Sequence, residues 1–340
     1  MSMKQHTGRK IAILCIFACF LILFFVLMAV RLQLAAAQTG QFRNKVWQGD
    51  ETVYSQVSCY LSEDAGLSAD SITELRRGLD LELETASLKP ANDSARLWID
   101  AYSTETTLTA ENGGNSVKVS ATAVGGEFFF FHPIPLLSGY YFSEEELMHD
   151  RVVIDENLAW QFFGSSDVAG QRITIGGKPF LVAAVTQPED NALFAASYGK
   201  KPHLYLSYSA LAEMLPERKI TCYEAILPSP VTGFGKELVA KGLSNAGFSA
   251  EAVENSARFS IPNLWERLKS IGNRSMRLDT IQYPYWENIA VVIQDRCALL
   301  LFGELAALAL SLIALVIAFL IFKQDLKALG GKLVPKHFKR

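Results

Sequence analysis

An acidic side chain lies inside a strongly apolar segment near the C-terminal end of the sequence. Glu304 interrupts the run ALLLFGELAALALSLIALVIAFLIF, residues 298–322, together with Gly303 and Ser311. A charge in the centre of a bilayer costs about 3 kcal/mol on insertion scales. Glu304 must therefore be protonated, contact another helix, or reach the outer interface, and ion transport is a further alternative.

Two cysteines occupy similar places in two strand-like stretches. Cys59 precedes Tyr60 in TVYSQVSCYLS (52–62), and Cys222 precedes Tyr223 in KITCYEAIL (219–227). If these strands are neighbours in a sheet, the thiols could meet, and an extracytoplasmic compartment permits oxidation. A disulfide is therefore possible, and two small buried apolar side chains are the alternative.

Other signatures of catalysis are missing from the sequence. The five histidines show no metal-ligand spacing, and neither an HExxH pair nor a GxxxxGK[ST] phosphate loop occurs. We assign no catalytic, cofactor-binding or metal-binding residue and expect the chain not to be an enzyme. Any ATP must be used by a separate polypeptide. The acids Glu144, Glu145 and Glu146 are typical of a solvated helix start after Ser143, with a cation site as the alternative.

Two apolar segments near the ends are long enough to cross a bilayer. Residues 11–31 and 298–322 each provide about 20 or more residues, enough to span roughly 30 Å of hydrocarbon as a helix. Ala35, Ala36 and Ala37 offer a signal-peptidase-like site, but the first run exceeds an ordinary signal sequence and Arg31 separates it from the alanines. We therefore expect two transmembrane helices.

The charges outside these helices predict their orientation. Three basic residues precede the first helix, and the segment after the second has six basic residues against the single acid Asp325. Both termini are therefore expected in the cytoplasm. All but one of the 35 acidic side chains lie between these tails, so the outer segment is acidic and a poor nucleic-acid binder.

The segment between the helices predicts an α+β domain. Alternating residues 52–62, helical spacing over 70–88 and a strand at 96–102 form one β-α-β unit. A second unit comprises a strand at 219–227, a helix at 235–247 and a strand at 248–254. Together they suggest a ferredoxin-like split β-α-β sandwich. The stretch 152–185 predicts strand, helix, turn and two strands, inserted between the halves.

Residues 125–146, GGEFFFFHPIPLLSGYYFSEEE, followed by residues 151–185, RVVIDENLAWQFFGSSDVAGQRITIGGKPFLVAAV, resemble the extracytoplasmic core domain of MacB/FtsX-type ABC transporter permeases. PHLYLSYSALAEML (202–215) resembles the strand and helix that follow in this family. The FFFF run (128–131) reads as a core strand or as an exposed apolar patch. The motif residues read as structural rather than catalytic: Gly139, Ala159, Phe163, Gly164, Asp167, Gly170, Ile173, Ile175, Gly177 and Phe180.

The resemblance implies a domain plan and a function. We expect a cytoplasmic N-terminus (1–10), helix one (11–31), a core domain (32–284) with porter-like halves 52–142 and 219–256 and an insertion 143–218, a stalk helix (285–297), helix two (298–322) and a basic cytoplasmic tail (323–340). Family members work with a separate ABC-type ATPase, whose motion reaches the outer domain. Residues 285–329 can form one helix suited to that coupling.

The sequence departs from the family in its membrane helices. Family members typically have three helices after the core domain, whereas one is found here. The chain could act beside a longer permease, as a homo- or hetero-oligomer. The alternative function is a non-transporting membrane-anchored scaffold or sensor that binds envelope ligands or regulates a cell-wall enzyme.

Overall fold

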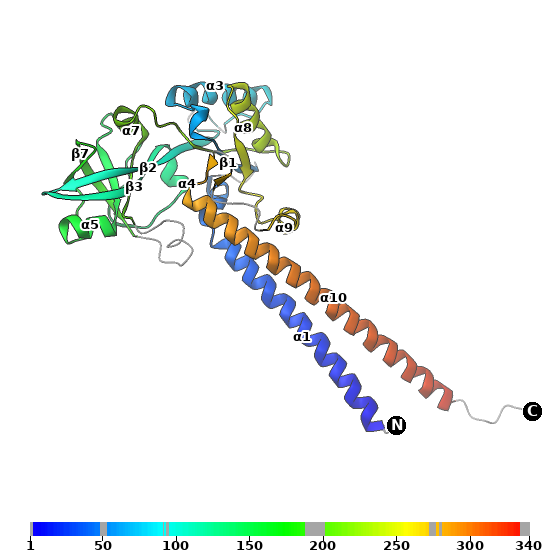
Figure 1. Cartoon of the computed structure of the whole chain (residues 1–340). Helices are drawn as coiled ribbons and strands as arrows, with labels where there is room; N and C mark the ends of the chain where they lie inside the picture. The colour runs from blue at the N-terminus through cyan, green and yellow to red at the C-terminus, as the bar shows by residue number, and fades with distance from the viewer. Residues whose placement is uncertain are drawn as a thin grey trace, which may run out of the picture. The chain divides into compact units, whose positions relative to one another are not determined.

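The structure is a computed structural model that describes residues 3–47, 53–90, 92, 95–187, 201–271, 277–278 and 281–333 (Figure 1). The chain divides into two compact units. We call residues 38–260 with 272–292 the sheet unit, and residues 1–37, 261–271 and 293–340 the helical unit.

The first half of the sheet unit has the predicted ferredoxin-like topology. Its strands are β1 (Tyr54–Tyr60), β2 (Ile99–Asn112), β9 (Cys222–Pro228) and β10 (Glu251–Glu254). They lie in the order β10-β1-β9-β2, and each neighbouring pair is antiparallel. The helices α3 (Ala69–Thr85) and α8 (Phe234–Asn245) complete the two β-α-β units and lie together on one face of the sheet (Figure 1).

The same sheet continues through six further strands. They are β3 (Asn115–Gly126), β4 (Leu136–Gly139), β5 (Arg151–Asp155), β6 (Arg172–Ile175), β7 (Lys178–Thr186) and β8 (His203–Ser207). The order continues β2-β3-β8-β5-β7-β4, and β6 pairs with β2 and β7. Because β4 pairs with β7, the inserted part begins before residue 136, so the boundary predicted at 142/143 is too late.

The inserted part follows the predicted order of elements. Among its described residues, three helices accompany the strands: α4 (Phe128–Phe131), α5 (Glu156–Phe163) and α7 (Tyr208–Met214). Asp155 starts α5, since its Oδ1 accepts a hydrogen bond from the Leu158 amide at 2.8 Å. Gly164 ends α5 at a φ of +66°, which a side chain would disfavour. Short elements complete the unit: η1 (Thr39–Phe42), α2 (Asn44–Trp47), η2 (Glu63–Ala65), β11 (Arg277–Leu278) and β12 (Ile281–Gln282).

The core lies between the sheet and the pair α3 and α8. Helical spacing brings four side chains of α3 to the sheet, and all are at most 3% exposed: Ile72, Leu75, Leu79 and Leu83. Gly242 of α8 allows close packing, because a Cβ there would lie 2.9 Å from Leu75 Cδ1. The predicted apolar face of residues 70–88 is confirmed.

Residues 128–131, FFFF, form neither a core strand nor an exposed apolar patch, which are the two alternatives predicted from the sequence. Phe128 to Phe131 make the one-turn helix α4, so the predicted strand is wrong. Phe128 is 2% and Phe131 0% exposed, which places them in the core. Gly126, at a φ of +63°, turns the chain out of β3 immediately before this helix. That turn is the physical reason why the strand does not continue.

No disulfide joins Cys59 and Cys222 in the structure, although their strands are neighbours as expected. Both thiols are free and buried. In the register of β1 and β9, Cys59 lies opposite Tyr223 and Cys222 lies opposite Tyr60. Since side chains alternate along a strand, the one-residue offset places the thiols on opposite faces of the sheet.

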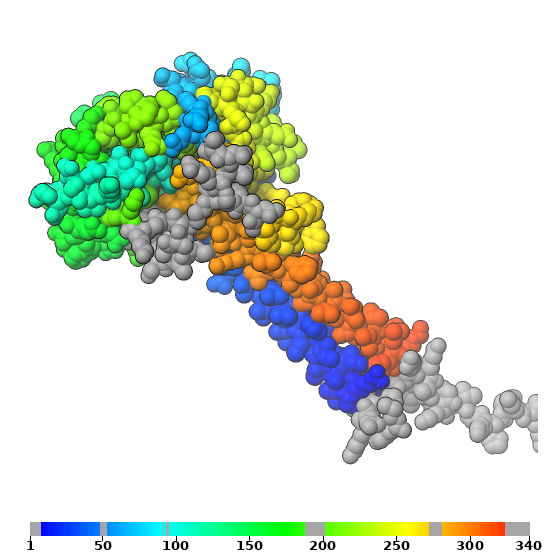
Figure 2. Space-filling model, viewed as in Figure 1, coloured from blue at the N-terminus to red at the C-terminus, as the bar shows by residue number. Residues whose placement is uncertain are grey.

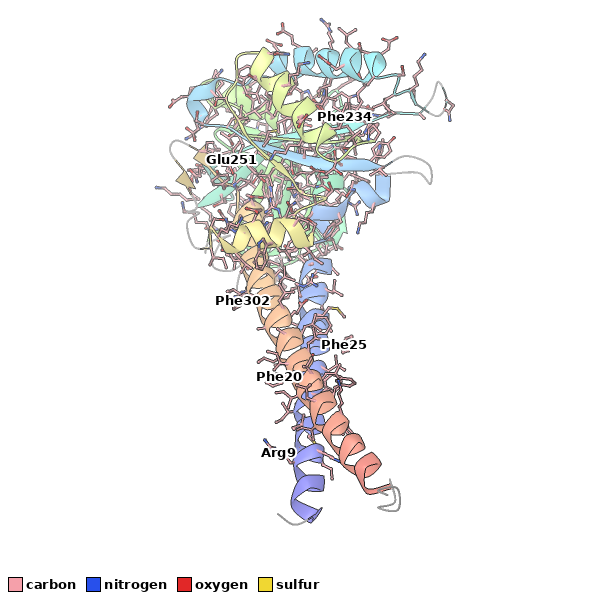
Figure 3. All side chains as sticks on the ribbon, turned by 90° about the vertical axis from the view of Figure 1, so that its right-hand side faces the viewer. Arg9, Phe20, Phe25, Phe234, Glu251 and Phe302 are labelled. Atoms are coloured by element: carbon pink, nitrogen blue, oxygen red, sulfur yellow. The ribbon has the colours of Figure 1, made fainter. Side chains whose placement is uncertain are left out.

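The described residues of the helical unit form two long helices and a short one. They are α1 (Met3–Ala36), α10 (Tyr285–Leu333), which begins in the sheet unit, and α9 (Ile261–Leu268). In the helical unit α1 and α10 lie side by side (Figure 2). Phe25 and Phe302, which are 52% and 59% exposed, project from the pair (Figure 3). Each long helix is long and apolar enough to cross a membrane. Residues 334–340 of the predicted basic tail lie outside the described residues.

Candidate functional site

A buried ion pair holds the first turn of α10 within the sheet unit. Glu287 Oε2 accepts hydrogen bonds from Arg258 Nη2 at 2.7 Å and from the Tyr60 hydroxyl at 2.8 Å. Arg258 lies in the turn after β10, and Tyr60 ends β1. The side chains of Arg258 and Glu287 are 1% and 0% exposed. The start of α10 is thus attached to two parts of the sheet by a charged contact closed to water.

The same network continues across the sheet. Arg258 Nη2 donates to Asn255 Oδ1 at 3.2 Å, and Asn255 Nδ2 donates to Ser58 Oγ at 2.6 Å. Ser58 Oγ in turn donates to Glu224 Oε1 at 2.6 Å. The second oxygen of Glu224 is hydrogen-bonded to His132 Nε2 at 2.5 Å. The chain of contacts therefore links α10, β1, β9 and the residue that ends α4.

Aromatic rings pack around this network and involve α10 again. The Trp286 ring lies 4.5 Å from the His132 ring and 5.7 Å from the Phe128 ring, centroid to centroid. The hydroxyls of Tyr285 and Tyr205 are 3.0 Å apart. Three consecutive residues of α10 thus contact the core of the sheet unit. We call this set of contacts around residues 285–287 the α10 anchor.

The chemistry of the α10 anchor is that of a structural attachment for the start of α10 rather than that of a catalytic site. In a low-dielectric interior, removing one partner of a buried ion pair leaves an uncompensated charge, so the network favours one geometry of the helix start. Burial, followed by the charge of Glu287, raises the pKa of Tyr60 well above its ordinary value. The phenol therefore stays a neutral hydrogen-bond donor at physiological pH.

A second charged cluster joins the two halves of the sheet unit. The Arg76 guanidinium makes two hydrogen bonds to Asp100, at 2.8 and 2.9 Å, and one to Glu144 at 3.2 Å. Glu144 also accepts hydrogen bonds from the Tyr102 hydroxyl and the Gly126 amide, both at 2.6 Å. Residues 144 and 145 form a turn, so the predicted helix start after residue 143 is wrong. The hydrogen bonds of Glu144 to Arg76, Tyr102 and Gly126 hold the chain in this turn.

In the helical unit, Glu304 contacts the neighbouring helix. Its Oε1 accepts from Arg31 Nε at 2.7 Å and its Oε2 from Arg31 Nη2 at 3.1 Å. The two side chains are 9% and 3% exposed. The Cys297 thiol lies 3.8 Å from the Arg31 carbonyl oxygen, and Gly303 brings α10 close to Leu27. Among the alternatives predicted for Glu304, the structure shows the contact with another helix, which is α1.

Within the described residues, no group of three or more His, Cys, Asp or Glu side chains could hold a metal ion. A hollow of about 590 Å³ on the sheet unit lies beside the end of α3 and the start of β2. Its lining mixes the acids Asp80 and Glu84 with the bases Lys89 and Arg96, and Trp98 beside them. Its described lining contains no serine, threonine, cysteine or histidine.

Comparison with known proteins decides the family. The family model for the MacB-like periplasmic core domain matches residues 11–240, which is more than half of the chain. The chain belongs to this family. A curated MacB-family relative is the macrolide export ATP-binding/permease protein MacB of Chromobacterium violaceum, 27% identical over 122 residues. That alignment covers 35% of this chain and 18% of the relative, so the chain spans less than a fifth of its length.

Solved domains of related transporters are similar to this MacB-like chain. The extracellular domain of the noncanonic ABC-type transporter YknZ from Gram-positive bacteria is 13% identical, with a TM-score of 0.40, and 59% of this chain and 98% of that domain are covered. The periplasmic region of MacB from Actinobacillus actinomycetemcomitans is 12% identical, with a TM-score of 0.43 and coverages of 65% and 94%.

The MacB-like motif residues lie in the inserted part of the sheet unit, where they shape turns and a core. Ala159 of α5, Ile173 and Ile175 of β6, and Phe180 of β7 are at most 2% exposed, whereas Phe163 is only partly buried. Gly164, Asp167 and Gly170 lie in the connection from α5 to β6. Gly177 belongs to the β6–β7 turn, and Gly139 ends β4. None of them contributes to the α10 anchor.

The sequence reasoning did not find the α10 anchor. A signal was present, because Glu224 is the one charged residue of the otherwise apolar strand β9. Glu224 in KITCYEAIL, in particular, is an acid on a central strand, where a charge needs a buried partner. Its partners are up to 166 residues away in the chain, so spacing alone could not name them.

Proposed function

We propose that this protein is a permease-like membrane subunit of a MacB/FtsX-type ABC transporter. In this proposal a separate ABC-type ATPase works in the cytoplasm, and the chain carries its motion to the extracytoplasmic sheet unit. The chain itself is not an enzyme and uses ATP only through that subunit. Family membership supports the class of protein.

The α10 anchor is the observation that carries the proposal. Helix α10 is unbroken over Tyr285–Leu333, and its first eight residues belong to the sheet unit while the remainder belongs to the helical unit. A displacement of the membrane part of α10 acts on residues that are hydrogen-bonded inside the sheet unit. The Arg31–Glu304 pair makes α1 part of the same moving element.

Both termini are proposed to lie in the cytoplasm, where an ATPase could dock. The basic residues at the start of α1, and those at the end of α10 and beyond it, support this orientation. A longer permease could complete the membrane part, because this chain offers two candidate spans among its described residues.

Purification of the tagged full-length protein from its native host in a mild detergent tests the proposal. We expect an ABC-type ATPase, alone or with a longer permease, to co-purify, and ATP hydrolysis by the complex to respond to the chain. The matched variant is Arg258→Met, which should retain the ATPase but uncouple the sheet unit. We expect the unchanged protein to change the protease sensitivity of its sheet unit when ATP is added, and the variant to lose this change.

Recovery of cell-wall enzymes or other envelope proteins without any ATPase would contradict the proposal. The non-transporting scaffold or sensor would then be the better function, because it requires the same membrane anchors and the same domain but no energy source. An ATPase that co-purifies equally well with an unrelated membrane protein would also count against it.

A further inference from the structure

Helix α9 has a fixed place in the helical unit. Arg267 Nε of α9 donates to Asp295 Oδ1 of α10 at 2.5 Å, and these side chains are 12% and 22% exposed. Leu264 of α9 is fully buried. Arg267 and Leu264 are three residues apart and therefore share one face of the helix. This face attaches α9 to its unit, and α9 lies beside α10 in Figure 1.

The remaining surface of α9 is divided into an apolar and a polar face. Ile261 and Trp265 are one turn apart on the same side of the helix and are 60% and 47% exposed. Glu266 projects on the opposite side, where it is exposed and pairs with Lys269 at 2.7 Å. A short helix with one attached face, one exposed apolar face and one charged face has the pattern of an interfacial helix.

The position at which α9 contacts α10 places the apolar face of α9 next to the membrane surface. Asp295, the partner of Arg267, is four residues before Leu299, which corresponds to about 6 Å along a helix. Leu299 is 55% and Phe302 59% exposed, and both belong to the apolar run of α10. The contact of α9 is therefore within one helical turn of the side chains that face lipid.

We propose that α9 lies in the interface of the extracytoplasmic leaflet, with Ile261 and Trp265 inserted at the boundary of headgroups and acyl chains. Tryptophan is enriched at that depth because its ring is apolar and its N–H is polar. Exposed apolar side chains of the candidate span in α10 begin within one turn of the Arg267–Asp295 contact, which is why lipid rather than a protein partner is the proposed occupant. The cations Arg267 and Lys269 are each paired with an acid, so the contact does not require anionic lipid.

This location gives α9 a role. It leads directly from the turn that carries Arg258 of the α10 anchor, three residues before α9 begins. If α9 is held at the membrane surface, the chain between Arg258 and α9 keeps a fixed distance from the bilayer while α10 moves. The inference depends on membrane insertion of the helical unit but not on an ATPase partner.

Quenching of tryptophan fluorescence by brominated lipids tests the proposal. The full-length protein is placed in nanodiscs of phosphatidylcholine, either unbrominated or carrying bromine at a shallow or a deep acyl position. We expect the bromine-dependent quenching of the unchanged protein to fall clearly in Trp265→Phe, and the part lost to be larger with shallow than with deep bromine. Added salt should not change this quenching, since Arg267 and Lys269 are each paired with an acid.

Trp160→Phe is the matched control, because Trp160 of α5 is also about half exposed, at 54%, but belongs to the sheet unit. This variant should retain the quenching. If Trp265→Phe retains it as fully as Trp160→Phe, α9 does not contact lipid and its apolar face is instead a site for a protein partner, which overturns the proposal. The quenching experiment needs neither ATP nor an ATPase. Failure of the interfacial-helix proposal is therefore distinguishable from failure of the transport proposal.

Discussion

At the scale of single residues, the charges inside the sheet unit carry the largest consequences. Glu287 is an acid without exposed surface whose hydrogen bonds come from Arg258 and Tyr60, on two separate parts of the fold. A buried pair of this kind adds little net stability, but loss of one partner is costly. It therefore determines where α10 begins more than how stable the fold is.

Arg258→Met should lower the free energy of unfolding of the sheet unit by about 3–5 kcal/mol, because it removes one partner of a buried ion pair and leaves the charge of Glu287 in the interior. Urea unfolding of the full-length protein in detergent, followed by tryptophan fluorescence, measures this. The double variant Arg258→Met with Glu287→Met should recover most of the loss, since both charges are gone.

The control for this prediction is Lys241→Met. Lys241 of α8 pairs with Glu82 of α3 at 3.1 Å, but the two side chains are 60% and 44% exposed. Such a surface pair contributes at most about 1 kcal/mol. Equal losses in Arg258→Met and Lys241→Met would show that the α10 anchor is not a buried ion pair in solution.

Asp155 predicts a pH dependence of stability. Burial raises the pKa of this carboxyl to about 6, although the amides of Leu158 and His203 donate to it. Between about pH 4 and pH 6 the folded chain then binds more protons at this site than the unfolded chain, so its contribution to stability falls as pH rises. Burial also lowers the pKa of the His203 imidazole to about 3, which gives a contribution of opposite sign over the same range.

Asp155→Asn separates the two contributions. This variant cannot titrate at position 155, so its thermal midpoint should rise more steeply, or fall less steeply, with pH between about 4 and 6 than that of the unchanged protein. Thermal unfolding of the full-length protein at several pH values measures the slopes. Identical slopes would mean that the pKa of Asp155 is the same in the folded and the unfolded chain, which contradicts a raised value.

At the scale of elements, the edge strand β4 depends on one glycine. Gly139 has a φ of +78°, and a Cβ there would lie 2.0 Å from the Ala183 carbonyl oxygen of β7. That oxygen already accepts a hydrogen bond from the Tyr140 amide at 3.1 Å. A methyl group would therefore separate β4 from β7 as well as strain the backbone.

Gly139→Ala should accordingly destabilise the fold by more than Gly164→Ala. Gly164 has a similar φ of +66°, but a Cβ there would meet nothing within 4 Å, so only the left-handed backbone is penalised, by about 1–2 kcal/mol. Amide hydrogen exchange of β7 should increase in Gly139→Ala alone. Equal exchange in both variants would contradict the steric explanation.

Several elements could be predicted from sequence because their signals are local. The apolar spacing of α3, the strand pattern of β1 and the turn glycines between residues 164 and 177 match the structure within a few residues. The long hairpin of β2 and β3 was missed beyond residue 102, because β2 is rich in threonine there, and the alternation of Val117, Val119, Ala121 and Ala123 in β3 was not used. The α10 anchor and the Arg31 partner of Glu304 depend on contacts between distant residues, which a single sequence does not reveal.

At the scale of the whole molecule, the distribution of charge predicts the topology in the membrane. A fluorescent protein fused after Arg340 should fluoresce, because both termini are expected in the cytoplasm. An alkaline phosphatase domain inserted at the exposed turn Gly113–Gly114 of the β2–β3 hairpin should be active, since it would lie outside. Activity of the same enzyme when fused after Arg340 would show the opposite orientation.

The free cysteines of the sheet unit have a consequence for assembly. Burial raises the pKa of the Cys59 thiol to about 12, and that of Cys222 well above its ordinary value. Because the thiolate is the reactive form, neither residue is a ready substrate for oxidants or for thiol exchange. The outer domain can thus mature after export without the oxidative folding machinery. Cells that lack such oxidases, or that grow without oxygen, should assemble it as readily as aerobic cells do.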